Sequence, residues 1–245
     1  MKIVRRLLSR YQPFRVCLWH TGRCGSSVVA DLIRRDGRID WAGEVLERPS
    51  IEWAGFSGEG ALRRCREAIS RRRYDAGRMP FGFEMKLWHY HRLDLTTLGV
   101  RNMVAGLGFE KHVVLERRNY LRQRVSGRVA EESGRYHRRA GEKPAAVTIT
   151  IDLDTLMHFI ELCEGFYGTI RAALSDHLYL TYEDDIEVDP TAAYTKIMRH
   201  VGLKPQAVTT DRRKTTPRTL RNVIENYEEV AEVLSGTRHA WMLDG

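Results

Sequence analysis

The residues best suited to chemistry lie in the segment FRVCLWHTGRCGSSVVADLI, Phe14 to Ile33. An apolar run, Val16 to Trp19, ends at a glycine-containing loop, Thr21 to Gly25, and the hydroxyl residues Ser26 and Ser27 open a helix-compatible run. A strand, a glycine loop and a helix N-terminus in this order bind phosphate, because loop N–H groups and the positive end of the helix dipole face one spot. The segment therefore favours a phosphate site.

The loop differs from that of the common nucleoside triphosphatases. It lacks the Walker A pattern G-x-x-x-x-G-K-[ST], and Arg23 stands inside it, two residues before Gly25. Glycine and serine also occur at ordinary strand-to-helix turns, since glycine tolerates positive φ and serine caps helices. Taken alone, the loop does not separate the two interpretations.

A second segment, HVVLERRNYLRQRVSGRVA from His112 to Ala130, repeats this logic. A β-prone run ends at Glu116, and Asn119 is a suitable N-cap for the helix that follows. Arg118, Arg122 and Ser126 are spaced i, i+4, i+8, so we expect them on one helix face. An arginine fork and a serine hydroxyl on one face suit a single phosphate group.

Together, RCGSS (Arg23–Ser27) and RRNYLRQRVS (Arg117–Ser126) resemble the two cofactor motifs of sulfotransferases. That family uses 3′-phosphoadenosine 5′-phosphosulfate (PAPS). The resemblance implies that Arg118 and Ser126 hold the 3′-phosphate. It implies that the first loop holds the 5′-phosphosulfate through Arg23, Cys24, Gly25, Ser26, Ser27 and Val28, with Cys24 in place of the usual small residue. The match is to the bacterial and carbohydrate-type branch.

Further segments extend the resemblance over most of the chain. AGEVL (Ala42–Leu46) is similar to the Gly-Glu segment that carries the general base of carbohydrate sulfotransferases, which implies Glu44 as the base. FGFEMKLW (Phe81–Trp88) resembles their central G-x-K strand with Lys86, and LYLTYEDD (Leu178–Asp185) resembles a later strand. The tail from Arg212 resembles the segment that closes over the nucleotide, where Lys214 and Arg218 would reach the 3′-phosphate.

The acceptor hydroxyl must lose a proton as it attacks the sulfuryl group, and Glu44 is the first candidate to take it. The apolar neighbours Trp41, Val45 and Leu46 predict a pKa raised toward neutrality. His20 and His89 are the second choices for this role.

Three other groups have alternative roles. Lys86 either steadies the sulfuryl oxygens or is a surface lysine. His89-x-His91, read as a strand, places both imidazoles on one face, but no third metal ligand is evident, so no metal is expected. Asp184 and Asp185 either contact the acceptor or cap the following helix, and capping is favoured.

Apolar runs predict strands, and segments of helical period alternate with them. This alternation predicts an α/β fold with a mainly parallel sheet flanked by helices, in one domain over residues 1–245. The resemblance implies a P-loop-like sulfotransferase fold. The breaker-rich Gly134–Pro144 is expected to be an exposed loop. The predicted strands are Val16–Trp19, Phe81–Leu87, His112–Leu115, Val147–Ile151 and Leu178–Tyr182. The predicted helices are Ala61–Arg72, Asn119–Glu132, Leu153–Leu174, Thr191–Val201 and Leu220–Leu234.

Composition narrows the partners. Lys and Arg total 40 against 32 Asp and Glu, a formal charge of +8, which favours anionic partners. No apolar run is long enough to span a membrane, and four scattered cysteines without a C-x-x-C pair indicate a reducing cytoplasm. We expect sulfuryl transfer from PAPS to a sugar or glycoconjugate hydroxyl, with no nucleic-acid partner. The alternatives are a P-loop-related kinase without the Walker lysine and a basic nucleic-acid-binding module.

Overall fold

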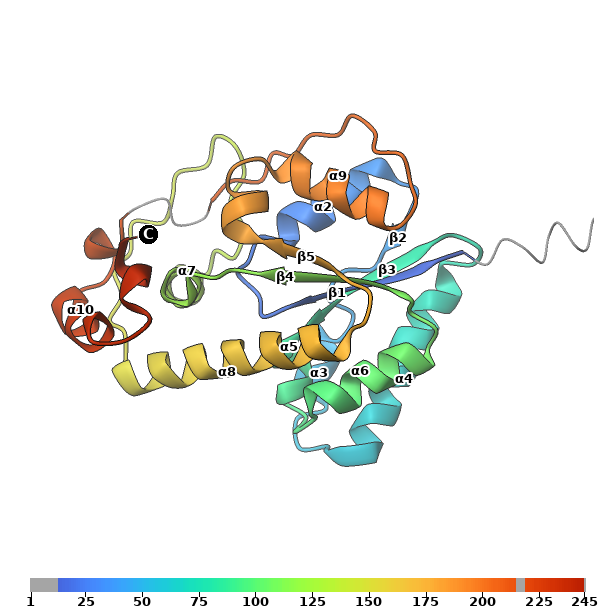
Figure 1. The fold of residues 1–245 in the computed structure, drawn as a ribbon, viewed down its shortest axis with the longest axis horizontal. Helices are drawn as coiled ribbons and strands as arrows, with labels where there is room; N and C mark the ends of the chain where they lie inside the picture. The colour runs from blue at the N-terminus through green and yellow to red at the C-terminus, as the bar shows by residue number, and fades with distance from the viewer. Residues whose placement is uncertain (1–12, 215–218, 245) are drawn as a thin grey trace, which may run out of the picture.

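The fold is built on one parallel β-sheet, shown in a computed structural model that describes residues 13–214 and 219–244 (Figure 1). Its strands lie in the order β2-β3-β1-β4-β5, and every neighbouring pair is parallel. The predicted α/β class is therefore confirmed. The strands are β1 (Arg15–His20), β2 (Asp40–Trp41), β3 (Phe81–Lys86), β4 (Lys111–Glu116) and β5 (Leu178–Thr181).

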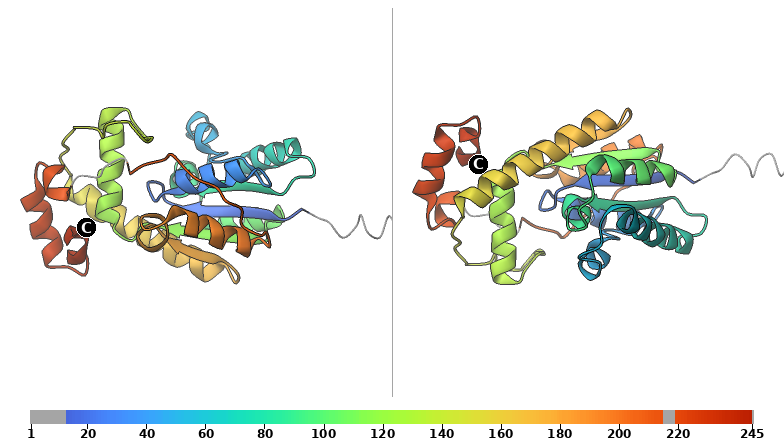
Figure 2. Two further views of the ribbon diagram at one scale, coloured as in Figure 1. Left: turned by 90° about the horizontal axis from the view of Figure 1, so that it is seen from above. Right: turned by 90° about the horizontal axis from the view of Figure 1, so that it is seen from below.

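Helices cover both faces of the sheet (Figures 1 and 2). Helices α2 (Ser26–Asp36) and α9 (Pro190–His200) pack together on one face. The other face is covered by α4 (Gly58–Asp75), α6 (Thr97–Gly106) and α8 (Leu153–Ala173). Such double coverage is what a parallel sheet requires, because both of its faces are apolar.

The remaining elements gather near the carboxyl ends of the strands. Figure 2 shows α7 (Tyr120–Ser133) running across these ends, with α10 (Tyr227–Ser235) beyond it. The shorter elements are α3 (Glu47–Glu52), α5 (Leu87–His91), the π-helix η1 (Tyr182–Ile186) and the 3₁₀-helices η2 (Leu220–Asn222) and η3 (Ala240–Asp244). No helix among the described residues is long and apolar enough to cross a membrane.

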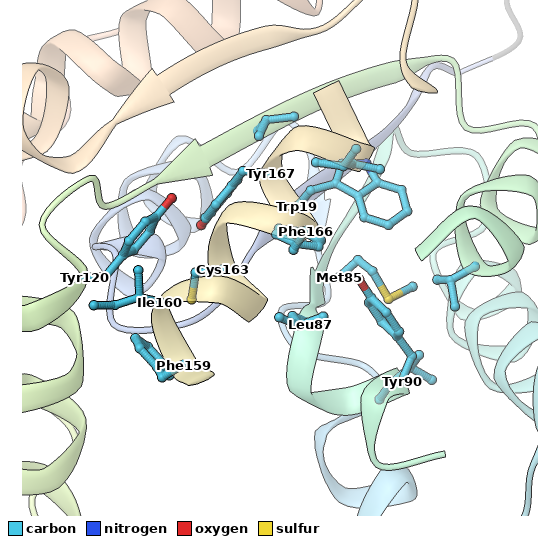
Figure 3. Packing of buried hydrophobic residues seen from close by; sticks show 14 of the residues in the cluster. Trp19, Met85, Leu87, Tyr90, Tyr120, Phe159, Ile160, Cys163, Phe166 and Tyr167 are labelled. Atoms are coloured by element: carbon cyan, nitrogen blue, oxygen red, sulfur yellow. The ribbon is translucent and has the colours of Figure 1, made fainter. Parts of the chain in front are cut away.

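Alternate residues of β1 enter two separate cores. Val16 and Leu18 pack toward α2 and α9, whereas Cys17 and Trp19 join the larger core on the α8 side. Figure 3 shows Trp19 and Met85 beside the inner face of α8. The apolar stripe of α8 is core, as its helical period predicts, and includes Leu156, Phe159, Ile160, Cys163, Phe166 and Tyr167.

Two predicted elements are wrong for one shared reason. The run Val147–Ile151 forms no strand, and the predicted helix Leu220–Leu234 is broken between η2 and α10. Ile149 instead pairs with the backbone in that break: its N–H donates to Val223 O (2.8 Å), and Glu225 N–H donates to its carbonyl (2.9 Å). Two segments far apart in the chain thus satisfy each other's backbone groups outside the sheet.

Sequence patterns also missed short elements. Strand β2 and helices α3, α5 and α6 were not expected. The other four predicted strands are confirmed, as are helices over 61–72, 119–132, 153–174 and 191–201 to within a few residues. Gly134–Pro144 is an exposed, largely irregular loop, as predicted. The central strand is β1, so Lys86 ends the strand beside it rather than the central one.

Gly82 on β3 lies where the sheet is closely packed against neighbouring side chains. A Cβ at this position would lie 2.4 Å from Trp41 Cε3 and 2.9 Å from Val16 Cγ1. We predict that Gly82→Ala lowers the free energy of unfolding by about 1–3 kcal/mol, because the indole has to move. Urea unfolding measures the change. Gly168→Ala is the control, since Gly168 is exposed within α8 and has open space around it. That substitution should be neutral or stabilising by up to ~1 kcal/mol.

Candidate active site: a cationic cavity at the carboxyl ends of the strands

A cavity of about 1030 Å³ opens where β1, β3 and β4 end. Ligands of parallel α/β proteins bind at this edge of the sheet. The cavity wall is strongly cationic, because its basic side chains outnumber its acidic ones. The bases are Arg23, Arg34, Lys86, Arg92, Arg117, Arg122, Arg124, Arg138, Arg212, Arg213 and Lys214; the acids are Glu44, Glu47, Glu84, Glu131 and Glu187.

The predicted phosphate loop forms one wall of this cavity. Helix α2 starts at Ser26, and the loop before it turns through Gly22, Arg23 and Gly25 at positive φ values of 86°, 51° and 90°. A Cβ on Gly25 would lie 2.8 Å from Ile186 Cγ2, so the turn packs directly on η1. The wall contains Arg23, Gly25, Ser26, Ser27 and Val28.

Two expectations for this loop need correction. The Val28 N–H already donates to Gly25 O at 2.9 Å, so it is not a free donor for a phosphate. Cys24 is fully buried and is not part of the cavity wall. The first-turn N–H groups of Ser26 and Ser27 have no intrahelical acceptor, as at any helix N-terminus, and these remain suited to an anion.

Side chains from three distant segments hold the loop in place. Gln123 Nε2 of α7 donates to Thr21 Oγ1 and to Gly22 O, both at 2.6 Å. The Tyr167 hydroxyl lies 3.0 Å from Thr21 Oγ1, and Trp88 Nε1 donates to Thr21 O at 2.6 Å. None of these residues was expected from sequence, because each acts through a contact that only the fold creates.

The two predicted motifs meet at Arg23 and Ser126. Arg23 donates from Nε and Nη2 to Ser126 Oγ, at 3.1 and 3.0 Å, and from Nη1 to Tyr136 O at 2.7 Å. Ser126 is buried in α7 and faces the same cavity as the loop. One guanidinium therefore joins the β1–α2 loop, helix α7 and the segment after α7.

Arg118 does not share a helix face with Ser126, and that expectation is wrong. Asn119 caps α7 by accepting from Arg122 N–H, as predicted, so Arg118 precedes the helix and its side chain is not held to the helical period. Its Nη2 donates to Asp184 at 2.7 Å, its Nε lies 3.7 Å from Glu183, and it is not part of the cavity wall.

Arg117, which sequence reasoning passed over, takes the position beside the cavity. It is buried, its guanidinium lies 4.3 Å above the Tyr182 ring, and its Nη1 donates to Arg23 O at 3.3 Å. Arg122 lines the cavity as well. In the sequence, Arg117 is marked only by its position just after a buried strand. Arg118 shares that position, so the sequence does not show which of the two arginines faces the cavity.

Glu44 lies at the centre of a second polar group. Its Oε2 is 3.0 Å from Lys86 Nζ and 3.0 Å from His89 Nε2, and both Glu44 and Lys86 line the cavity. His89 is almost completely buried behind the carboxylate. The structure thus brings together Glu44, Lys86 and His89, while Arg23 of the phosphate loop belongs to the other wall.

The pKa of Glu44 is lowered, not raised as the apolar neighbours suggested. Burial favours the neutral acid, but the contact with His89 and the positive charge of Lys86 outweigh it and hold the pKa well below its ordinary value. Burial in turn lowers the pKa of His89, which favours a neutral imidazole beside the carboxylate. Glu44 is therefore ionised at neutral pH.

His20, Glu44 and Glu84 lie close enough to hold a metal ion, with one ligand atom of each within 4.8 Å of the others. Other contacts oppose that use. His20 Nδ1 accepts from Gly22 N–H at 3.0 Å, which leaves the ring proton on Nε2, 3.4 Å from Glu84. Glu44 is already paired with Lys86. The group is better suited to a hydrogen-bonded ion-pair network than to a cation.

The remaining site candidates fall in different places. His89 and His91 lie on helix α5, not on a strand; two residues apart on a helix, they point in different directions, His89 buried and His91 exposed. Lys214 lines the cavity and pairs with Glu187, whereas Arg218 lies outside the described residues.

Asp184 and Asp185 are engaged within the protein. Asp184 pairs with Arg118, as described above. Asp185 is buried and accepts from Thr181 N–H at 2.8 Å, which ties η1 to the end of β5. Neither residue caps the following helix, so that expectation is wrong: Asp189 caps α9 by accepting from Thr191 N–H.

No protein-family model and no curated protein matches this sequence.

The lowered pKa of Glu44 predicts a pH-dependent contribution to stability. A carboxyl whose pKa falls on folding stabilises the protein above its unfolded pKa, near 4.5, and loses that contribution as the pH falls toward the folded value. Glu44→Gln should therefore lower the free energy of unfolding by about 1–3 kcal/mol at pH 7, and by progressively less below pH ~4.5. Urea unfolding at several pH values measures this. Glu232→Gln, an exposed change on α10, is the control. A difference that is constant with pH would contradict the assignment.

Proposed function

We propose that this protein is a PAPS-dependent sulfotransferase that moves a sulfuryl group to an acceptor hydroxyl, most simply on a sugar or glycoconjugate. The observation that carries the proposal is the contact between Arg23 and Ser126, since it joins the two motifs that resemble those of sulfotransferases on one cationic cavity. The parallel sheet, with the phosphate-type loop after its central strand, is compatible with the P-loop-like sulfotransferase fold.

The nucleotide side of the proposed site is the wall formed by the β1–α2 loop and α7. The free N–H groups at the start of α2, the hydroxyls of Ser26 and Ser27 and the guanidinium of Arg23 would hold the 5′-phosphosulfate. Ser126 and the neighbouring Arg117 would hold the 3′-phosphate, because both line the cavity and Arg118 does not. Lys214 is positioned to approach from the carboxyl-terminal segment.

Bound PAPS supplies a neutral SO₃ unit that leaves a phosphate for an acceptor oxygen. Negative charge grows on the phosphate oxygen as the sulfur–oxygen bond breaks, and by analogy with phosphoryl transfer the protein positions the groups and stabilises this charge. Arg23 and the first turn of α2 lie on that wall. Their donors are directed by the fold before substrate binds, which is the arrangement that favours a developing anion.

Glu44 would accept the acceptor proton. An ionised carboxylate is in the correct state to do so, but a low pKa makes it a weak base. Lys86 offers a way to strengthen it, because anionic sulfuryl oxygens would compete with Glu44 for the ammonium group. Weakening this 3.0 Å ion pair raises the pKa of Glu44 as the donor binds. The buried His89 would keep the carboxylate oriented.

Nucleotide binding tests the first half of this proposal. Adenosine 3′,5′-bisphosphate should raise the melting temperature clearly more than ATP, because only the bisphosphate has a 3′-phosphate and ligands stabilise the state that binds them. Ser126→Ala should remove most of this difference. Ser133→Ala is the matched control: Ser133 closes the same helix, is not part of the cavity wall, and bonds to Val129 O. Equal stabilisation by the two nucleotides in the unmodified protein would contradict the proposal.

Turnover tests the second half. Glu44→Gln should reduce labelled sulfuryl transfer by about 10²–10⁴-fold, because the amide cannot take the proton. The Kd for adenosine 3′,5′-bisphosphate, measured by calorimetry, should stay close to that of the parent, since Glu44 contacts Lys86 and His89 rather than the loop. EDTA should leave transfer unchanged. Near-normal turnover would transfer the base role to His89, while loss of bisphosphate binding would make Glu44 a structural residue.

A further inference from the structure

One part of the cavity wall has no role in the chemistry proposed above. It is formed by Trp88 and Arg92 of α5, Arg124 of α7 and Phe159 of α8. Helix α5 connects this part to Glu44: its His89 points inward to the carboxylate, while Trp88 and Arg92, four residues apart, share the side that lines the cavity. The wall therefore adjoins the position where an acceptor hydroxyl would meet the base.

The aromatic part of this wall is rigidly held. Trp88 and Phe159 stack with their ring centroids 5.7 Å apart and their planes 18° from parallel. The indole is fixed further by the hydrogen bond from its Nε1 to Thr21 O, and the Arg124 guanidinium lies 5.7 Å from the Phe159 ring. A fixed aromatic surface at the edge of a polar cavity suits the C–H face of a sugar ring, which needs apolar contact without losing its hydroxyl hydrogen bonds.

The cations of this wall form no direct ion pair with an acid of the described residues, although Glu131 and Asp152 act on Arg124 from a longer distance. Within the described residues, neither Arg92 nor Arg124 forms an ion pair, although their neighbour Arg128 pairs with Glu131 at 2.9 Å. Unpaired guanidinium groups on a concave surface attract an anionic ligand and orient it, since arginine binds carboxylate and sulfate oxygens with two parallel hydrogen bonds. These two are separate from Arg23, Arg117 and Arg122 on the nucleotide side.

Resting on the proposed sulfotransfer, we infer that the acceptor is an acidic carbohydrate. One sugar ring packs on Trp88, and a carboxylate or sulfate group of the same chain pairs with Arg92 and Arg124. The hydroxyl to be modified then lies toward Glu44. A neutral sugar would leave both guanidinium groups unpaired and would bind more weakly.

Binding of matched oligosaccharides tests this inference. The probes are a chondroitin tetrasaccharide, which carries glucuronate carboxylates, and the same tetrasaccharide with those carboxylates reduced to alcohols. Calorimetry with and without adenosine 3′,5′-bisphosphate should show the acidic form binding about 10-fold more tightly. The double variant Arg92→Gln/Arg124→Gln should bring this ratio close to one. Trp88→Leu should weaken both forms by the same factor, because it removes the stacking surface but no charge.

A control variant and a separate readout of nucleotide binding keep the test decisive. Arg199→Gln removes an exposed arginine of α9, outside the cavity wall, and should leave the ratio unchanged. Equal affinity for the two tetrasaccharides, no binding of the acidic form, or a preference that survives in the double variant would overturn the inference. Failure of the proposed function appears differently: adenosine 3′,5′-bisphosphate would not bind at all, while the preference for the acidic sugar, measured without nucleotide, would be unaffected.

Discussion

The interaction on which the site depends most is the set of hydrogen bonds from Arg23. This residue has positive φ in a loop after the central strand, and its guanidinium reaches Ser126 on α7 and the carbonyl of Tyr136 beyond that helix. These contacts add to those of Gln123, which also joins α7 to the loop before α2. Because the donors come from one planar group, the positions of the β1–α2 loop and α7 are set together.

The cavity contains both a cluster of arginines and an ionised carboxylate, and the two groups do not pair with each other. On the wall formed by the β1–α2 loop and α7, arginines lie next to arginines, with Arg117 stacked on Tyr182 and bonded to a backbone oxygen rather than to a carboxylate. On the opposite side, the charge of Glu44 is compensated by Lys86, and the carboxylate also contacts His89. The adjacent arginines repel one another, which costs free energy until an anion binds between them. The ion pair with Lys86 keeps the Glu44 carboxylate ionised beside these arginines. The proposed binding of a polyanion and removal of a proton would use both arrangements.

The buried residues His20 and Glu84 form a pair close to Glu44. His20 ends β1, and Glu84 lies two residues before the end of the neighbouring strand β3, where it also accepts from Trp41 Nε1 at 3.1 Å. His20 accepts from Gly22 N–H, so the pair links the phosphate loop to the strand that carries Lys86. Burial strengthens each of these contacts, and any shift of the strand would leave buried polar atoms without partners.

The sequence by itself determined the class of fold, most of the strands and long helices, the position of the phosphate-type loop and the cap of α7. These features depend on local patterns: apolar runs, helical period and the conformational freedom of glycine. The tertiary structure alone decided that Arg117 rather than Arg118 faces the cavity, because an N-cap at Asn119 leaves Arg118 outside the helix. It also decided the pKa of Glu44. Apolar neighbours in sequence suggested a raised value, but a pKa follows the charges and polar contacts that surround a group in space, and Lys86 and His89 come from other elements.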